Sequence, residues 1–419
     1  MSHRRIVVTG VGAVSPLGVG AEVLADRWCA GESGIEGGHG RCSDFEPAQY
    51  LKKKEIKRYD RFTQFSVVAA EEALAAAGWT EELPAPPHRI GCVIGTGNGG
   101  CETIEQGLYE LIEGPEYVSS LLIPKSMANA APGVLALRFG LEGPAFAVVS
   151  ACSSGADAII DGIRMLRLGE TDAMVVGGAE AEIVRMPLAA FSNMEALSES
   201  GMSRPFDARR DGFVMGEGAG ILVLEAAEIA EARGAPVYGE ILGYGSTNDA
   251  HHIVAPHPEG RGAIMAIERA LEDAGIGPQD VDYVNAHGTG TPANDRAETR
   301  ALKAVLGDRA KDVPVSSLKS AIGHLIGAAG AVESVATLAA LRRRVAPPTL
   351  NYEVPEEGLD LDYVPNESRP LFENPPSGGQ AARGNGDRTV AISNAFGFGG
   401  HNSVLVLAAN GSAASAASA

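Results

Sequence analysis

Short apolar runs rich in β-branched residues alternate with helical patterns along most of the chain. In its first part the runs are Ile6–Thr9, Arg89–Ile94, Ala145–Val149 and Ala173–Val176, most of them bounded by glycine or proline. Between them, Phe62–Ala77 repeats apolar residues at helical spacing. Such runs are typical of strands that are buried on both faces of a sheet covered by helices. The alternation therefore predicts an α/β fold.

The same pattern restarts after Arg233. The second part contains three strand patterns, two helix patterns and a closing pair of strands: Val237–Leu242, Val281–Asn285, Val313–Ser316, Ala263–Ala274, Ala328–Arg342, Val390–Ser393 and Ser403–Val406. We therefore expect two similar α/β halves, residues 1–235 and 236–409, although no clear sequence repeat relates them. Composition predicts an exposed Pro/Gly-rich loop over residues 374–387 and a disordered Ala/Ser tail over residues 410–419.

Charge and hydropathy exclude several classes of protein. The 419 residues include 34 Lys and Arg against 53 Asp and Glu, a net charge of −19, and 45% are hydrophobic. Such a chain is too apolar for intrinsic disorder and too acidic to bind nucleic acid through its overall field. No apolar run approaches the roughly 18 residues of a membrane span. The apolar stretch Ile6–Val14 is short, contains glycines and precedes Pro16, so a buried strand is favoured over an export signal.

The cysteine pattern narrows the setting of the protein. Five cysteines are present, and no two have C-x-x-C spacing: Cys29, Cys42, Cys92, Cys101 and Cys152. An odd number without paired spacing argues against a disulfide framework or a zinc site, and fits a reducing cytoplasm. No cysteine follows Cys152.

Cys152 lies between the predicted strand Ala145–Val149 and a helical pattern that starts at Ser153. The positive end of a helix dipole favours a thiolate, and the small neighbours leave room for a substrate. The alternative is an inert buried cysteine. Position alone leaves both open.

Two histidines stand near glycines. His287 ends a predicted strand and opens a Gly/Thr loop, and His324 follows Gly323 before a small-residue helix. Either can be structural or catalytic. A shared metal site is not favoured, because no H-x-x-x-H pattern exists and His251 and His252 are adjacent.

Two glycine-rich segments allow alternative interpretations. Phe396–Asn402, between two predicted strands, is either a tight hairpin or a loop whose free amides bind an oxyanion. Gly95–Gly100 matches the dinucleotide-binding fingerprint, but the prolines that follow, Pro115, Pro124 and Pro132, leave no clean βαβ unit. Nucleotide binding is therefore not favoured.

Five motifs, in this order, resemble the class II elongating β-ketoacyl-acyl-carrier-protein synthases. The motifs are Ser150–Gly155, Ser203–Gly220, Ala286–Thr291, Lys319–His324 and Gly397–Gly400. That branch of the thiolase superfamily includes fatty-acid enzymes and type II polyketide ketosynthases. The resemblance implies a thiolase fold, in which duplicated α/β halves form five αβαβα layers, and a dimer.

The resemblance also implies a decarboxylative Claisen condensation. Cys152 takes an acyl group from an acyl carrier protein, malonyl-carrier protein loses carbon dioxide, and the resulting carbanion attacks the acyl-Cys152 thioester. The substrates are attached to the phosphopantetheine of the carrier protein, and neither a metal nor another cofactor is implied.

The resemblance also implies roles for individual residues, most of them within the five motifs. His287 and His324 are implied to hydrogen-bond the malonyl thioester, Lys319 to orient His287, and Glu333 to be a buried charge partner. The amides of Cys152 and Phe398 are implied to form an oxyanion hole, with Phe398 as a gate. The positions implied to contact substrate are Thr289, Thr291, Asn98, Phe191 and Gly399.

Related classes fit less well. Degradative thiolases use a second cysteine near the C-terminus, initiating and chalcone-type synthases use Cys-His-Asn, and the chain-length-factor subunits, which are non-catalytic scaffolds, lack the nucleophile. Three departures favour a specialised acyl chain, such as a polyketide or polyene intermediate, and a non-identical chain-length-factor partner: Asn98 at a usually apolar position, Met186–Leu188 (preceded by Arg185) in place of Thr-Pro-Leu, and the 374–387 segment.

A basic run stands out on this acidic chain. Lys52–Arg61 contains six basic and two acidic residues, which suits an acidic carrier protein. By resemblance, Lys54, Lys57 and Arg58 match carrier-docking positions. The alternative is a solvated helix start.

Overall fold

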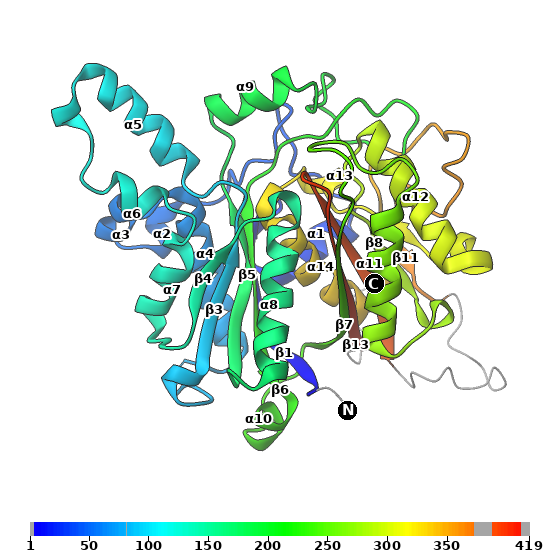
Figure 1. The fold of residues 1–419 in the computed structure, drawn as a ribbon, viewed down its shortest axis with the longest axis horizontal. Helices are drawn as coiled ribbons and strands as arrows, with labels where there is room; N and C mark the ends of the chain where they lie inside the picture. Colours follow the sequence, from blue (N-terminus) through cyan, green and yellow to red (C-terminus); the bar gives the residue numbers. More distant parts are fainter. Residues whose placement is uncertain (1–3, 81, 373–387, 412–419) are drawn as a thin grey trace.

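The computed structural model describes residues 4–80, 82–372 and 388–411 (Figure 1). Its strands form one large sheet, in the order β4-β3-β5-β6-β1-β7-β13-β12-β8-β9, with β2 paired to β1. The strands are β1 (Ile6–Ser15), β2 (Gly18–Val19), β3 (Ile90–Gly95), β4 (Ala145–Val148), β5 (Ala173–Glu180), β6 (Gly218–Ala226), β7 (Gly239–Asn248), β8 (Tyr283–Asn285), β9 (Val315–Ser316), β12 (Arg388–Gly397) and β13 (His401–Asn410). A separate pair joins β10 (Val345–Ala346) to β11 (Arg369–Pro370).

Helices cover both faces of this sheet. They are α1 (Ala21–Cys29), α2 (Pro47–Tyr50), α3 (Lys53–Arg58), α4 (Arg61–Ala76), α5 (Cys101–Glu113), α6 (Leu122–Ser126), α7 (Ala130–Phe139), α8 (Ser154–Leu168), α9 (Arg185–Asn193), α10 (Ala227–Ala232), α11 (Arg261–Ala274), α12 (Pro292–Leu306), α13 (Lys319–Ile322) and α14 (Ala329–Arg343). No helix in the described ranges is long and apolar enough to cross a membrane.

The sheet divides into two halves that join weakly. The strands from β4 to β1 form the first half and those from β7 to β9 the second, and β1 meets β7 only where Ile6–Val8 pairs with Gly239–Ile241. Helices α8 and α14 contact strands of both halves and therefore lie between them. Helices α4 and α7 cover the outer face of the first half, and α11, backed by α12, covers the outer face of the second. These are the five layers that the resemblance implied.

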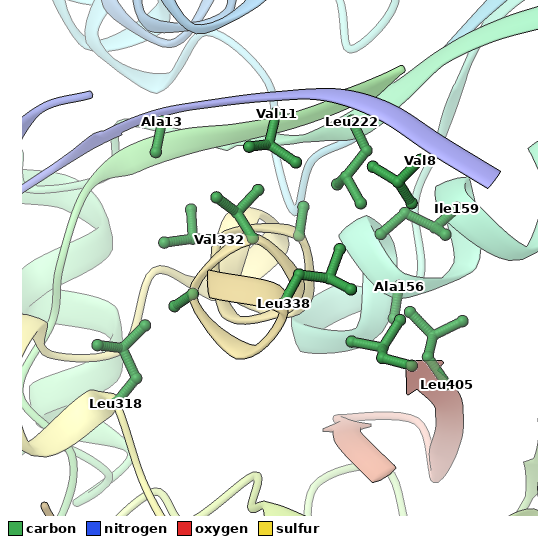
Figure 2. Close-up of a cluster of buried hydrophobic side chains, with 14 of the residues drawn as sticks. Val8, Val11, Ala13, Ala156, Ile159, Leu222, Leu318, Val332, Leu338 and Leu405 are labelled. Carbon is green, nitrogen blue, oxygen red and sulfur yellow. The ribbon is translucent and has the colours of Figure 1, made fainter. Parts of the chain in front are cut away.

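The hydrophobic core is likewise layered. A central cluster packs α8 and α14 against both half-sheets, and Figure 2 shows Val332 and Leu338 of α14 facing Val11 and Leu222 of the first half. Two outer clusters lie beneath α4 and α7 and beneath α11 and α12. Each cluster excludes water from one helix–sheet interface, which holds the layers together.

Glycines bring α8 and α14 into close contact. A Cβ at Gly155 would lie 2.9 Å from the Gly327 carbonyl oxygen, and a Cβ at Gly330 would lie 2.9 Å from the Ala156 Cβ. Larger side chains would push the helices apart. The contact places the start of α8 beside the loop that carries His324.

The strands and helices predicted from the sequence are all present, several of them longer than predicted. Three details differ. The β6 strand was not predicted, β4 is an edge strand with Ala145 exposed rather than buried on both faces, and Asn410 ends β13 rather than starting a disordered tail. The 374–387 loop and the tail from residue 412 lie outside the described residues. The division at residue 235 remains a prediction.

Candidate active site

Cys152 occupies a tight turn between β4 and α8. It is the middle residue of the 3-10 turn Ala151–Ser153, and Ala151 has a φ of 53°, a left-handed conformation that L-residues rarely adopt. The turn ends where α8 begins, so the thiol stands at the helix N-terminus, as predicted. Its side chain faces a cavity of about 340 Å³.

The turn around Cys152 is fixed by Asp157 in the first turn of α8. Ser150 Oγ and Ser153 Oγ donate to Asp157 Oδ2 at 2.5 and 3.0 Å, and Ser403 Oγ of β13 donates to Asp157 Oδ1 at 2.5 Å. One carboxylate therefore ties the nucleophile turn to the far half-sheet. The sequence reasoning missed this residue.

Burial and the helix N-terminus act on the Cys152 thiol in opposite directions. Burial raises the pKa of the Cys152 thiol to about 12, against the opposing effects of the Lys319 charge and the Phe398 amide. The helix dipole and these two groups do not outweigh desolvation. Burial therefore favours the protonated thiol in the substrate-free cavity.

His324 offers a donor to the cavity. Its Nδ1 accepts from the Ile326 amide at 3.2 Å, so the neutral ring carries its proton on Nε2. Burial and the Lys319 charge hold the pKa of His324 well below its usual range. The Nε2 atom is buried and has no partner among the described residues. A substrate oxygen can therefore accept this proton in a hydrogen bond.

A buried ion pair keeps His287, like His324, neutral with its ring proton on Nε2. Lys319 Nζ lies 3.4 Å from His287 Nδ1 and 2.5 Å from Glu333 Oε1. Because the ammonium faces Nδ1, the ring proton lies on Nε2. Burial, and then the charge of Lys319, hold the pKa of His287 well below its usual range. The His287 and His324 rings lie 5.4 Å apart, nearly perpendicular.

Glu298 fixes the backbone of the His287 loop. Its two carboxyl oxygens accept from the His287 and Gly288 amides, each at 2.8 Å, and Asn394 also donates to it. Burial raises the pKa of Glu298 to about 7. Nothing in the sequence singled out this residue, because eleven positions separate it from His287 and its role depends on how α12 packs.

The glycine loop after β12 approaches the nucleophile closely. A Cβ at Gly397 would lie 2.8 Å from the Ser150 carbonyl oxygen and 3.2 Å from the Cys152 amide nitrogen. The Phe398 amide lies near enough to the Cys152 thiol to act against the rise in the pKa of that thiol. The Cys152 amide thus lies beside the glycine loop that carries Phe398, and their joint role as an oxyanion hole stays a prediction. The hairpin alternative also holds, since β12 and β13 pair directly across this loop.

The remaining cavity wall is mostly apolar and aromatic, with several polar side chains that include Glu195, Asp249 and Asn294. Thr289 and Thr291 line it with their hydroxyls 2.8 Å apart. Phe191 of α9 also lines it and lies 6.4 Å from Phe398 between ring centroids. Of the predicted substrate contacts, Gly399 is exposed beside the cavity.

Asn98 lies apart from this cavity. It follows β3 and is exposed in the single chain, and its Nδ2 donates to buried Glu182 Oε1. The amide therefore has a hydrogen-bond partner, which removes the main cost of placing it beside an acyl chain.

The predicted docking residues are free at the surface. Lys54, Lys57 and Arg58 of α3 are exposed, and none forms an ion pair with any residue in the described ranges. Arg61, which ends the basic run, instead turns inward to pair with Glu217 at 2.7 Å. The basic surface is therefore narrower than the sequence run.

Part of the Ser203–Gly220 motif supports the site from behind. The His324 amide donates to the Val214 carbonyl at 2.6 Å, and the Gly216 amide donates to the His324 carbonyl at 2.8 Å. Arg210 of the same motif is buried and pairs with Asp295 and Glu356. The motif therefore supports the loop that carries His324.

Comparison with known proteins agrees with this geometry. A model of the β-ketoacyl synthase N-terminal domain matches residues 39–230, and a model of its C-terminal domain matches residues 238–353. The chain belongs to the β-ketoacyl synthase family. This β-ketoacyl synthase is therefore a condensing enzyme of the acyltransferase class, as the motifs predicted.

Individual relatives cover nearly the whole chain. The 3-oxoacyl-[acyl-carrier-protein] synthase 2 of Synechocystis sp. is 45% identical over 97% of this chain and 98% of its own. Among solved structures, the ishigamide ketosynthase/chain length factor is 34% identical, with a TM-score of 0.88 over 98% of this chain and all of that chain. A type II polyketide acyl-carrier protein in complex with its ketosynthase is 31% identical, with a TM-score of 0.86 over 97% and 100%. These likenesses confirm the thiolase fold of this β-ketoacyl synthase.

Proposed function

We propose that this β-ketoacyl synthase extends acyl chains carried by an acyl carrier protein, as a 3-oxoacyl-[acyl-carrier-protein] synthase. The observation that carries the proposal is one cavity lined by Cys152, His287 and His324, with the unpartnered Nε2 of His324 and the Phe398 amide near the thiol. A chain-length-factor scaffold needs none of these groups.

In the first half-reaction, Cys152 attacks the carrier thioester. The carbonyl oxygen becomes an oxyanion held by the Cys152 and Phe398 amides. Collapse expels the pantetheine thiolate, which takes up the proton that Cys152 gives up. The acyl group has then moved to Cys152 with no net change in protonation.

In the second half-reaction, malonyl-carrier protein binds with its thioester oxygen facing the Nε2–H groups of His287 and His324. Decarboxylation moves the electron pair of the broken C–C bond into the thioester, and the two donors stabilise the enolate. The enolate carbon attacks the acyl-Cys152 carbonyl. Cys152 leaves as thiolate and is reprotonated from solvent, which balances the loss of carbon dioxide.

Two surfaces support the partners of this reaction. The exposed basic residues of α3 suit an acidic carrier protein, and Thr289 and Thr291 offer hydroxyls to its pantetheine arm. No other cofactor is required by the chemistry. All five cysteines are free thiols, which fits an enzyme of the cytoplasm.

A second subunit is also part of the proposal. Strand β4 is an open edge, and α5 and α6 lie at the same end of the molecule (Figure 1). These two helices and the turn between them expose large apolar side chains: Leu108, Leu111, Ile112, Tyr117 and Ile123. An apolar face beside an open edge is typical of a subunit interface. The occupant is either an identical chain or a chain-length-factor partner, as in the ishigamide complex.

The test is condensation by the purified protein. Acyl-carrier and ¹³C-labelled malonyl-carrier proteins are supplied, and mass spectrometry follows the 3-oxoacyl product and the labelled carbon dioxide. Both should form with the wild type, and Cys152→Ala should form no 3-oxoacyl product. Absence of product with the wild type, alone and with a chain-length-factor partner, would overturn the proposal.

A further inference from the structure

A polar group lies beside the nucleophile and has no part in the reaction above. Strand β3 pairs in parallel with both β4 and β5, so the carboxyl ends of the three strands lie side by side. Asn98 follows β3, Cys152 follows β4, and Glu180 and Glu182 end and follow β5. The crevice at such strand ends is where α/β proteins bind ligands.

Glu180 is fully used by the protein. Its Oε1 accepts from Thr96 Oγ1 at 3.0 Å, and its Oε2 accepts from the Gly97 and Gly327 amides at 2.5 and 3.0 Å. It joins three loops around the nucleophile. Its role is therefore structural.

Glu182 is different. The side chain is fully buried, and its Oε1 accepts from Asn98 Nδ2, but its Oε2 has no hydrogen-bond partner among the described residues. A buried carboxyl oxygen without a partner is costly, and native proteins rarely retain one without a use. Burial also raises the pKa of this carboxyl, against the opposing hydrogen bond from Asn98. A protonated carboxyl can donate as well as accept.

The apolar wall around Cys152 leads to this carboxyl. Ile183, the next residue along the chain, packs with Cys152, Ile326 and Phe213 in one cluster. A Cβ at Gly97 would lie 3.0 Å from Ile326 Cγ2 and 3.6 Å from Glu182 Oε1. The Glu182 charge also lies near enough to Cys152 to raise the pKa of its thiol. Glu182 is therefore a near neighbour of any chain attached to Cys152.

We propose that Glu182, held by Asn98, is a specificity-determining residue that hydrogen-bonds a hydroxyl or ketone oxygen on the acyl chain attached to Cys152. The proposal rests on the proposed function and names its substrate class: oxygenated acyl chains in preference to plain saturated ones. An oxygen on the chain satisfies Glu182 Oε2, whereas a hydrocarbon leaves it unpaired.

The test compares rates of Cys152 acylation, followed by intact mass, from pantetheine thioesters in matched pairs. Each pair has one saturated chain and one of equal length with a single ketone or hydroxyl, whose position is moved along the chain. At the favoured position, the wild type should acylate about tenfold faster with the oxygenated chain. Glu182→Leu should abolish or reverse that ratio, and Glu182→Gln should retain part of it.

Two further variants separate specificity from folding. Asn98→Leu changes an exposed residue and should also lower the ratio of the two acylation rates, because Glu182 then loses the hydrogen bond that holds it in position. Ile183→Val alters the apolar wall and should change both rates together, leaving the ratio intact.

The outcomes are distinguishable from failure of the proposed function. Acylation of the wild type by both chains at equal rates at every position, or an unchanged ratio in folded Glu182→Leu and Asn98→Leu, overturns the inference and leaves the condensing activity standing. Absence of acylation of Cys152 by any thioester overturns the proposed function and the inference with it.

Discussion

Lys319 Nζ lies 3.4 Å from Nδ1 of His287, and both side chains are buried. This contact gives the ring nitrogen farther from the cavity an ammonium neighbour, so the ring proton stays on Nε2 and faces the substrate. The carboxylate of Glu333 keeps the ammonium charged in a dry environment. The Lys319–Glu333 ion pair therefore sets the tautomer of His287.

Lys319→Met should lower both stability and activity, and the two effects should separate in a double variant. The single change leaves Glu333 buried without a partner and should cost about 3–5 kcal/mol of unfolding free energy. Lys319→Met with Glu333→Leu should recover most of that stability while kcat stays about a hundredfold low, because His287 is no longer oriented. Denaturant unfolding and steady-state kinetics measure the two effects. Recovery of full activity in the double variant would show that the pair is only structural.

The raised pKa of Cys152 predicts how the free enzyme reacts with iodoacetamide. Only the thiolate reacts, so the alkylation rate of Cys152 should climb about tenfold per pH unit without levelling near neutral pH. The reason is that burial holds the thiol protonated up to a pKa of about 12. Peptide mapping against Cys152→Ser assigns the site. A plateau reached below about pH 8 would contradict this and restore the resting thiolate expected from the helix dipole.

Gly397→Ala should damage catalysis more than binding. The added methyl would meet the Ser150 carbonyl oxygen at 2.8 Å and displace the loop whose Phe398 amide faces Cys152. We expect kcat to fall by about 10²–10³, the loss typical of one oxyanion donor. Gly133→Ala is the matched control, because its added methyl meets nothing within 4 Å in helix α7 and should leave kcat unchanged. Equal kcat values for the two variants would show that the loop does not form the oxyanion hole.

Charge reversal on α3 should weaken carrier binding alone. Lys54→Glu, Lys57→Glu and Arg58→Glu together should raise the KM for acyl-carrier protein by about 10–100-fold, and added salt should shrink the difference. Turnover of a free pantetheine thioester should not change, because these exposed residues lie outside the cavity. An unchanged carrier KM would favour the alternative, a merely solvated helix.

Much of the fold could be predicted because buried strands and amphipathic helices follow their periodicities over long stretches. The α4 pattern matched to within a residue at each end, since its apolar face is unbroken. Strand β6 was missed because its start, Gly218–Gly220, carries no side-chain pattern. The exposure of β4 could not be predicted, because edge position is a property of strand order rather than of local sequence.

In the site, too, some residues could be predicted from the sequence and others could not. Motifs marked Cys152, His287 and His324, and the structure places them around one cavity. The supports Asp157 and Glu298 carried no signal, because their partners lie on other elements and include backbone amides. The sequence left the state of the Cys152 thiol open, because local position reveals the helix dipole but not the burial that raises the pKa of the thiol.

The most direct test of the central claim is the intact mass of the protein after incubation with acyl-carrier protein alone. The account predicts a mass increase equal to one acyl group, located on Cys152 by peptide mapping, and its transfer to the malonyl-derived unit when malonyl-carrier protein is added. Cys152→Ala should show no increase. An acyl group found on another residue, or condensation by the Cys152→Ala variant, would contradict the assignment of Cys152 as the nucleophile.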